Sequence, residues 1–417
     1  MGVFNFVSCS IFLGLGSLIF FLLSFSCGVN VFNFSALLWS DYFMFDSLSF
    51  YLILLVVFLG ALSLICLDNF LSSHTKLYLI ASLMFSILCF SVNHAVLFWC
   101  LYELSMLPLL FLIFKDSPYS ERFIAGWYFA VYLIITSLPL ILILLYLSSV
   151  NSSMFFNSWS ADSASTGIFI TLSFIFFTKV PLCPFHTWLP IVHAEATSIV
   201  SIFLSGYIMK LGLLGVFRCT PFIFGGTFYF YLFFCFVLSV FFLITASTEL
   251  DGKRWLAFLS LSHIVVGFLA YFVGDWEGVS FSFIFCLGHG LSAGLVFGFL
   301  WLCYDVSASR NWLLLKESFG GKTISILGVI SILSLCSFPP TLQFFCEVNL
   351  LIASLNSVAV TLFWCLYLFF GGLVPLILCG HLLIRSESVE GASYSSFSFM
   401  FYFSILAIWC YLGVFIL

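Results

Sequence analysis

Long apolar runs separated by short polar stretches organise the whole chain. Windows of about 19 residues, the length suited to detecting transmembrane helices, give thirteen apolar segments. These segments lie near residues 3–27, 47–67, 77–92, 95–114, 122–147, 166–192, 196–218, 226–247, 254–273, 279–303, 323–352, 357–383 and 396–417. A helix that crosses the ~30 Å hydrocarbon core uses roughly 20 apolar residues. The pattern therefore predicts an all-α polytopic membrane protein with about 13 transmembrane helices, in a single membrane domain over residues 1–417.

Two of these segments, 166–192 and 323–352, are too long for simple spans, and both contain prolines. Proline removes a backbone hydrogen bond from a helix, so we predict that both are interrupted helices. Unpaired backbone at membrane depth is tolerated only beside protein or a water-filled cavity. Interrupted helices in a membrane protein therefore indicate an ion or substrate pathway.

Composition excludes most other classes of protein. Only 7% of the residues are charged and the mean hydropathy is +1.25, whereas soluble domains average about 25% charged residues. A membrane barrel needs alternating apolar and polar residues. Disorder needs few aromatic residues, but 21% of this chain is aromatic. A net charge of −5 disfavours binding to nucleic acid.

The 15 cysteines include no C-x-x-C pair and lie mostly in apolar runs. We interpret them as small packing residues, neither metal ligands nor a disulfide framework. The sequence also contains no G-x-G-x-x-G or G-x-x-x-x-G-K-[ST] motif, so it predicts no nucleotide site. The opening stretch has no basic or Arg-rich region, which favours synthesis inside an organelle or insertion into a bacterial inner membrane.

Loop charges predict the orientation. The loops that follow odd-numbered segments carry one cation, Arg218. The loops that follow even-numbered segments, called the even loops below, carry nine: Lys76, Lys115, Arg122, Lys253, Arg254, Arg310, Lys316, Lys322 and Arg385. By the positive-inside rule, the even loops and the N-terminus face the cytoplasm or the mitochondrial matrix, and the C-terminus faces the opposite side.

Six ionisable residues lie inside predicted spans: Glu103, Lys179, Lys210, His263, His289 and Glu347. A charge at the bilayer centre costs between ~3 and ~17 kcal/mol depending on the method, so few such residues persist without a function. Two acids, two amines and two imidazoles on different helices have the chemistry of a proton relay. A buried amine gives up its proton more readily when a nearby carboxylate withdraws. Lys179 with Glu103 as a movable partner would thus act as a switch, with Lys210 or an imidazole as the next acceptor.

Other interpretations stay open for these residues. Glu103 and Lys179 could form a static ion pair, and Lys210 could extend towards the membrane surface. His263 and His289 could hydrogen-bond across helices as core residues or ligate a haem. Three further residues near the even loops form either a proton entrance or a static part of the loop: His186, His193 and Glu195. Asp251, Lys253 and Arg254 are expected to anchor a helix end at the lipid headgroups.

The string TKVPLCPFHTWLPIVHAEATSIVSIFLSGYIMKLG, from Thr178 to Gly212, resembles the signature of the antiporter-like subunits of respiratory complex I. Three further stretches narrow the resemblance to the NADH dehydrogenase (ubiquinone) subunit 4 family: YELSMLPLLFLI, DGKRWLAFLSLSH with HGLSAGLVFGFL, and FPPTLQFFCEVNLL. The resemblance covers nearly all of residues 40–417, which we expect to form an antiporter-like proton-translocating core of inverted repeats. It implies proton translocation across the inner mitochondrial membrane, coupled to electron transfer from NADH to ubiquinone.

The resemblance also implies roles and partners. Glu103 would modulate Lys179, the central switch; Lys210, His263 and His289 would form the lateral relay, and Glu347 the terminal site. The chain itself would bind no cofactor, while the complex uses NADH, FMN, iron–sulfur clusters and ubiquinone. Expected partners are the other membrane-arm subunits, the lipid bilayer, protons and internal water, with no nucleic acid. The sequence departs from the family in three ways. It has thirteen predicted spans where the family commonly has fourteen, which suggests a missing N-terminal helix. Thr197 stands in place of a usual proline, and Cys346 in place of a usual glycine.

Three other functions remain compatible with the sequence. A subunit of a multisubunit cation/proton antiporter shares the region around Lys179 and would exchange cations without a redox partner. A structural spacer subunit would use the buried charges only as static contacts. A small-solute transporter is disfavoured because the spans contain no large polar pocket.

Overall fold

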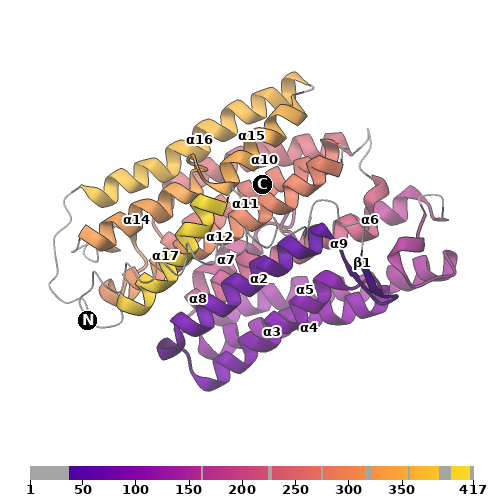
Figure 1. The fold of residues 1–417 in the computed structure, drawn as a ribbon, viewed down its shortest axis with the longest axis horizontal. Helices are drawn as coiled ribbons and strands as arrows, with labels where there is room; N and C mark the ends of the chain where they lie inside the picture. The colour runs from indigo at the N-terminus through magenta and orange to yellow at the C-terminus, as the bar shows by residue number, and fades with distance from the viewer. Residues whose placement is uncertain are drawn as a thin grey trace, which may run out of the picture.

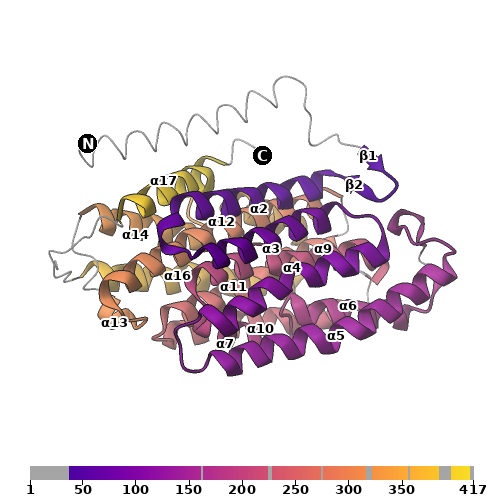
Figure 2. The ribbon, with the colours of Figure 1, turned by 90° about the horizontal axis from the view of Figure 1, so that it is seen from below.

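A computed structural model of the chain describes residues 37–160, 163–223, 228–273, 276–315, 322–355, 357–384 and 396–413. Most of these residues lie in helices that run side by side (Figures 1 and 2). In the described ranges, nine helices are at least 18 residues long and apolar enough to cross a membrane, and four shorter apolar helices accompany them. The predicted all-α membrane fold is confirmed. The first predicted segment, 3–27, lies outside the described residues.

The uninterrupted helices follow the predicted segments closely. They are α2 (Ser47–Cys66), α3 (Ser73–Ser91), α4 (Ala95–Asp116), α5 (Arg122–Val150), α10 (Tyr229–Thr248), α11 (Gly252–Val273), α12 (Trp276–Ser307), α16 (Val358–Leu383) and α17 (Ser396–Leu412). Several of these helices begin at a residue whose side chain accepts a hydrogen bond from a free backbone N–H group of the first turn. Asp46 accepts from the N–H of Ser49 at the start of α2, and Ser72 accepts from that of Thr75 at the start of α3.

Both predicted interruptions are present. Residues 166–192 divide into α6 (Thr166–Lys179) and α7 (Trp188–Glu195), and residues 323–352 divide into α14 (Lys322–Leu335) and α15 (Leu342–Ser354).

Other short elements were not predicted. The seventh segment divides into α8 (Ser198–Phe203), the π-helical turn η5 (Leu204–Ile208) and α9 (Met209–Cys219). The remaining short elements are β1 (Leu37–Ser40), β2 (Phe43–Phe45), η2 (Asp68–Phe70), η3 (Phe156–Ser158), η6 (Pro221–Ile223) and α13 (Trp312–Leu315). β1 and β2 pair as a small antiparallel hairpin. A π-turn leaves the chain helical and apolar, so hydropathy alone could not reveal it.

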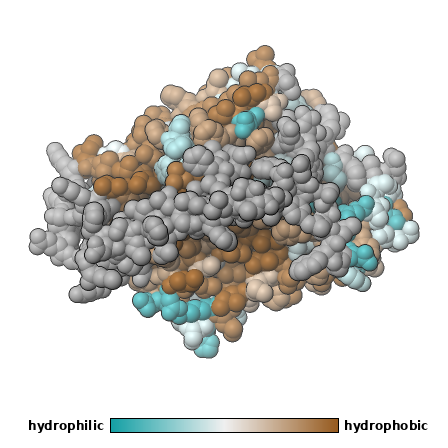
Figure 3. All heavy atoms as spheres, in the orientation of Figure 1, coloured by the Kyte–Doolittle hydropathy of each residue, from teal (hydrophilic) through white to brown (hydrophobic). Residues whose placement is uncertain are grey.

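α12 lies at the centre of the bundle and packs against α2, α8, α11, α14, α15 and α17. In Figure 1, α2, α3 and α4 run along one edge and α15 and α16 along the opposite edge, with α11 and α12 between them. Large apolar side chains on the outer helices are exposed, for example Trp127 and Leu142 on α5 and Ile377 on α16. Brown, hydrophobic atoms accordingly occupy much of the face that is not grey in Figure 3. Such a surface is suited to lipid, since soluble monomers rarely expose large apolar patches.

Loops predicted to share a membrane side contact one another. Among the even loops, the Thr75 hydroxyl donates to an Asp116 carboxylate oxygen at 2.8 Å. On the opposite side, Arg218 at the end of α9 pairs with Asp46 at the start of α2, with 3.0 Å between Nη2 and Oδ2. These contacts support the alternation of the spans. Arg218 is buried in this pair, so it packs inside the protein instead of lying in an exposed loop.

Candidate functional site

Glu103 and Lys179 face each other from α4 and from the last residue of α6. Their closest side-chain atoms, Glu103 Oε1 and Lys179 Nζ, are 3.7 Å apart. Charge-assisted hydrogen bonds measure about 2.7–2.9 Å, so the two side chains form an ion pair without a direct hydrogen bond at this distance. Lys179 is buried, and its ammonium also lies 5.5 Å from the centre of the Tyr102 ring. A cavity of about 10 Å³ beside Lys179 is at the lower limit for one water molecule.

The break after Lys179 has polar partners for its backbone. The indole N–H of Trp188 donates to the carbonyl oxygen of Thr178 at 2.9 Å, and the Tyr231 hydroxyl donates to that of Cys183 at 2.5 Å. These side chains compensate for helical hydrogen bonds that the proline-rich break removes. The break beside Lys179 thus has its backbone carbonyls bonded by side chains of α7 and α10.

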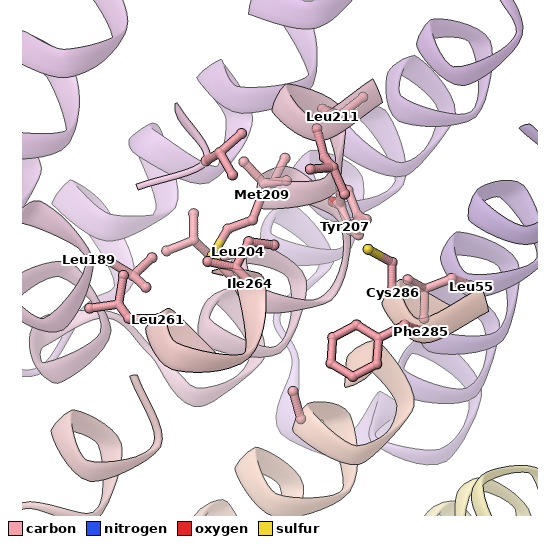
Figure 4. Close-up of a cluster of buried hydrophobic side chains, with 14 of the residues drawn as sticks. Leu55, Leu189, Leu204, Tyr207, Met209, Leu211, Leu261, Ile264, Phe285 and Cys286 are labelled. Atoms are coloured by element: carbon pink, nitrogen blue, oxygen red, sulfur yellow. The ribbon is translucent and has the colours of Figure 1, made fainter. Parts of the chain in front are cut away.

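Lys210 lies at the centre of the bundle, in the first turn of α9, and is fully buried. Its ammonium donates to the carbonyl oxygen of Ser205, which belongs to the π-turn η5. The predicted alternative, in which Lys210 extends to the membrane surface, is therefore wrong. Figure 4 shows the apolar side chains that gather in this region, including Met209 and Leu211 on either side of Lys210 in the sequence, and Cys286 of α12. This packing separates the amine from lipid and loop water.

His263 and His289 lie next to each other on α11 and α12, with 5.1 Å between their ring centres. Both are buried and within electrostatic range of Lys210. Within the described ranges, the Nε2 atom of His263 and both ring nitrogens of His289 have no hydrogen-bond partner. Unpaired buried polar atoms are uncommon in folded proteins, and such atoms are often found at functional sites. The structure thus brings the two imidazoles and the amine into one interior cluster.

Glu347, on α15, is the acid closest to His263. Its Oε1 atom lies 4.0 Å from His263 Nδ1 and accepts three hydrogen bonds: from Ser337 Oγ at 2.8 Å, Gln343 Nε2 at 3.1 Å and Tyr367 Oη at 3.2 Å. The Tyr367 hydroxyl also contacts His263 Nδ1 at 2.5 Å. A consistent proton arrangement has His263 Nδ1–H donating to Tyr367 while Tyr367 donates to Glu347. Tyr367 therefore bridges the imidazole and the carboxylate.

Sequence reasoning missed Ser337, Gln343 and Tyr367. Gln343 precedes Glu347 by four residues on α15, and this spacing places two side chains on one helix face, so the pattern could have indicated it. Ser337 lies in the break between α14 and α15, where polar side chains are expected. Tyr367 is one of 17 tyrosines in the chain and comes from α16. Nothing in its local sequence distinguishes it.

Among the groups near the even loops, Lys253 differs from the expectation. Lys253 was expected at the lipid headgroups together with Arg254; Arg254 is exposed, but Lys253 is buried. The ammonium of Lys253 donates to the Ala196 carbonyl oxygen at 2.7 Å because α11 begins directly beside the end of α7. His193 is fully buried and stacks on Phe297. His186 lies in the first break, with its ring against Phe242, and Glu195 pairs with Arg310.

Comparisons with known proteins agree with this architecture. Residues 92–374 match the family described as NADH:quinone oxidoreductase/Mrp antiporter, TM. NADH-ubiquinone oxidoreductase chain 4 of Chondrus crispus is 28% identical, over 93% of this chain and 84% of the relative. The chain 4 protein of Ceratitis capitata is 30% identical, over 75% of this chain and 72% of the relative.

A solved structure gives the same fold. A chain of respiratory complex I from Thermus thermophilus with bound NADH superposes with a TM-score of 0.78, at 20% identity, over 89% of this chain and 82% of that one. The resemblance carried by the sequence motifs is thereby confirmed. The chain belongs to the NADH:quinone oxidoreductase/Mrp antiporter transmembrane family, together with the NADH-ubiquinone oxidoreductase chain 4 proteins.

Proposed function

We propose that this chain is a membrane-arm subunit of NADH:ubiquinone oxidoreductase and moves protons across the inner mitochondrial membrane while the complex passes electrons from NADH to ubiquinone. The observation that carries the proposal is the series of ionisable groups inside the bundle, from the half-buried Glu103 at one end to the buried Glu347 at the other. Buried charges are costly in lipid. If the charges served only to form structural ion pairs at the two ends, the buried Lys210 amine between those ends would have no purpose. The chain 4 relatives support the same assignment.

The proposed steps use the contacts described above. With Glu103 near, Lys179 holds a proton; when Glu103 withdraws, the ammonium loses its compensating charge and releases the proton through internal water towards Lys210. Lys210 passes it to the imidazole pair. His263 then donates from Nδ1 to Tyr367, which donates its own hydroxyl proton to Glu347, so one proton moves and the tyrosine is unchanged. Glu347 is the terminal site next to the exit path.

The orientation and the partners belong to the same proposal. The nine cations of the even loops favour the matrix side for these loops, which puts the C-terminus on the intermembrane side. The N-terminus, proposed on the matrix side, lies outside the described residues. The proposed partners are other membrane-arm subunits and the lipid bilayer.

This chain would hold no redox centre of its own. NADH, FMN, the iron–sulfur clusters and ubiquinone would bind elsewhere in the complex. The chain's contribution to the enzyme is then the proton path alone, which the redox subunits drive from a distance.

Replacement of Lys179 by methionine tests the proposal. Methionine keeps the length and apolar stem of the side chain but cannot carry a proton. In the assembled complex we expect Lys179→Met to lower the number of protons moved per NADH oxidised. Lys115→Met is the matched control, because Lys115 is exposed at the end of α4, on the same helix as Glu103. An assembled Lys179→Met complex with an unchanged proton ratio would show that the chain is a structural spacer.

A cation/proton antiporter is the second candidate, since the family description names Mrp antiporters as well. The two functions differ in what drives transport. An antiporter exchanges sodium for protons in vesicles that lack NADH and quinone, and a complex I subunit does not. Sodium-driven proton movement by the purified chain under those conditions would replace the proposal with this alternative.

A further inference from the structure

Three successive backbone carbonyls at the end of α7 accept hydrogen bonds from side chains of three other elements. Arg310, which follows α12, donates to the carbonyl of Ala194; Ser117, which follows α4, donates to that of Glu195 at 2.5 Å; and Lys253, in α11, donates to that of Ala196 at 2.7 Å. The last carbonyls of a helix have no partner within the helix. A helix C-terminus also carries partial negative charge that attracts cations. The end of α7 is therefore fixed by hydrogen bonds from side chains of other segments.

Tyr119 joins the two cations into one group. The Arg310 guanidinium lies 4.1 Å from the centre of its ring, and Lys253 Nζ lies 5.0 Å from the ring centre and 3.4 Å from the hydroxyl oxygen. Cations at such distances are attracted to an aromatic face. Burial raises the pKa of the Tyr119 phenol, so the phenol stays neutral and can accept from Lys253. We call Ser117, Tyr119, Lys253 and Arg310 the even-side clasp.

The even-side clasp connects the end of α4, the helix that carries Glu103, to α7, which the break joins to Lys179 at the end of α6. Ser117 directly follows α4, on which Glu103 lies 14 residues earlier, about 21 Å along a helix. Lys179 ends α6 and leads through the break into α7. α4 and α7 are thus fastened together at one end, while Glu103 and Lys179 face each other in the interior at 3.7 Å. A small change in the angle between these elements alters that separation.

We propose that the even-side clasp sets the separation of Glu103 and Lys179, and that Lys253 is a positioning residue for proton transfer between this pair and Lys210. The inference rests on the proposed function of Lys179. Hydrogen bonds between nitrogen and oxygen measure about 2.7–3.2 Å, so the pair at 3.7 Å lies just outside that range, and a small displacement of either group can form or lose the contact. A clasp that holds α7 at a fixed distance from α4 would keep Glu103 and Lys179 close to hydrogen-bonding distance.

Lys253 is the member of the clasp whose removal tests this most cleanly. Arg310 forms the salt bridges of the group, with Glu195 and Asp251, each at 3.4 Å. Within the described part of the chain Lys253 has no carboxylate within 4.0 Å, and its hydrogen bonds go to a carbonyl and a phenol. Its replacement therefore frees the Ala196 carbonyl, one of the three held at the end of α7, without removing the cation that pairs with the acids. Arg254, the next residue, is exposed and provides a matched control.

The experiment compares Lys253→Met, Lys253→Arg and Arg254→Met in the assembled complex. We expect Lys253→Met to lower the number of protons moved per NADH and to shift the pH optimum of coupled NADH oxidation by about half a pH unit or more. Lys253→Arg should restore most of both, because a guanidinium can also donate to the Ala196 carbonyl, and Arg254→Met should match the parent. A purely structural role would reduce the amount of assembled complex but leave the ratio and the pH profile per complex unchanged.

Lys179→Met in the same set separates the two proposals. If Lys179→Met abolishes the chain's share of pumping while Lys253→Met behaves like Arg254→Met, the clasp inference is wrong and the proposed function stands. If Lys179→Met leaves pumping unchanged, the proposed function is wrong whatever Lys253→Met does. If Lys253→Met fails to assemble, Ser117→Ala removes one hydrogen bond of the clasp without removing a charge, and an unchanged ratio and pH profile for that variant would overturn the inference.

Discussion

The bridge between His263 and Glu347 can be removed by deleting one oxygen atom. Tyr367→Phe keeps the aromatic ring, which packs against Phe363 and Trp364, and removes the hydroxyl that contacts both His263 Nδ1 and Glu347 Oε1. After this change the Gln343 amide nitrogen still lies 3.3 Å from His263 Nδ1 and 3.1 Å from Glu347 Oε1, but an amide does not relay a proton readily, and the direct distance between imidazole and carboxylate is 4.0 Å. That distance is too long for a hydrogen bond. Proton transfer would then need a water molecule in the place of the hydroxyl.

The cost to stability follows from the two hydrogen bonds. A hydrogen bond to a charged group contributes about 1.5–3 kcal/mol and a neutral one about 0.5–1.5 kcal/mol, so the variant should lose roughly 2–4 kcal/mol if Glu347 is ionised. The lower half of this range is expected, because Ser337 and Gln343 continue to donate to the same carboxylate oxygen. A cavity of about 10 Å³ beside these residues, enlarged by the lost oxygen, could admit one water molecule. Pumping should therefore slow and not stop.

Tyr402→Phe is the matched control for this prediction. Tyr402 is as deeply buried as Tyr367, but its hydroxyl donates to the backbone carbonyl of Gly294 at 3.1 Å and touches no ionisable side chain of the relay. Both variants lose a buried phenol hydroxyl, and only Tyr367→Phe breaks the bridge. The assay is proton movement per NADH in vesicles containing the complex, with thermal inactivation measured in parallel. Equal proton ratios for the two variants would refute the role assigned to Tyr367.

Two further substitutions test the packing that positions the site. Arg218→Met leaves Asp46 buried without its ion-pair partner, which typically costs about 3–5 kcal/mol; the complex should inactivate at lower temperature, and Asp46→Asn in the same chain should recover part of the loss. Gly288→Ala places a Cβ atom 3.1 Å from the backbone nitrogen of Gln343, so we expect overpacking to lower the stability by about 1–3 kcal/mol. Gly380→Ala on α16 has open space around the new Cβ atom. This control variant should be neutral or more stable by up to about 1 kcal/mol. Equal thermal stability for the two alanine variants would contradict this reading of the α12–α15 contact.

Sequence periodicity predicted the helices well because lipid imposes a simple rule on them. A span must be about 20 apolar residues long, and a break within a span requires residues such as Pro181 and Pro184 that cannot complete the hydrogen-bond ladder. The two interrupted helices therefore followed from length and proline content. The ionisable residues inside spans were equally visible, since a charge such as Glu103 or Lys210 stands out in an apolar run.

The partners of those charges could not be predicted in the same way. Lys253 looked like a headgroup anchor because it stands at a helix start in a charged stretch, and only the end of α7 beside it explains its burial. The local sequence of Tyr367 on α16 shows no link to the relay. Its role depends on how α16 packs against α10 and α14, which brings the hydroxyl to His263 on α11 and Glu347 on α15. Tertiary contacts between distant segments leave no periodic trace in a single sequence.

Several polar partners of the relay come from places where the helices are irregular, although Gln343 and Tyr367 stand in regular helices. In a regular helix every backbone group is already bonded within the helix, so a buried amine or carboxylate finds few free partners there. Lys179 stands at the first break, Lys210 donates to a carbonyl of the π-turn η5, and Glu347 accepts from Ser337 in the second break. π-turns and broken helices release carbonyl and N–H groups. The ionisable residues and the backbone irregularities are therefore coupled: without the π-turn Lys210 would lose its carbonyl partner, and without the second break Glu347 would lose the Ser337 hydroxyl.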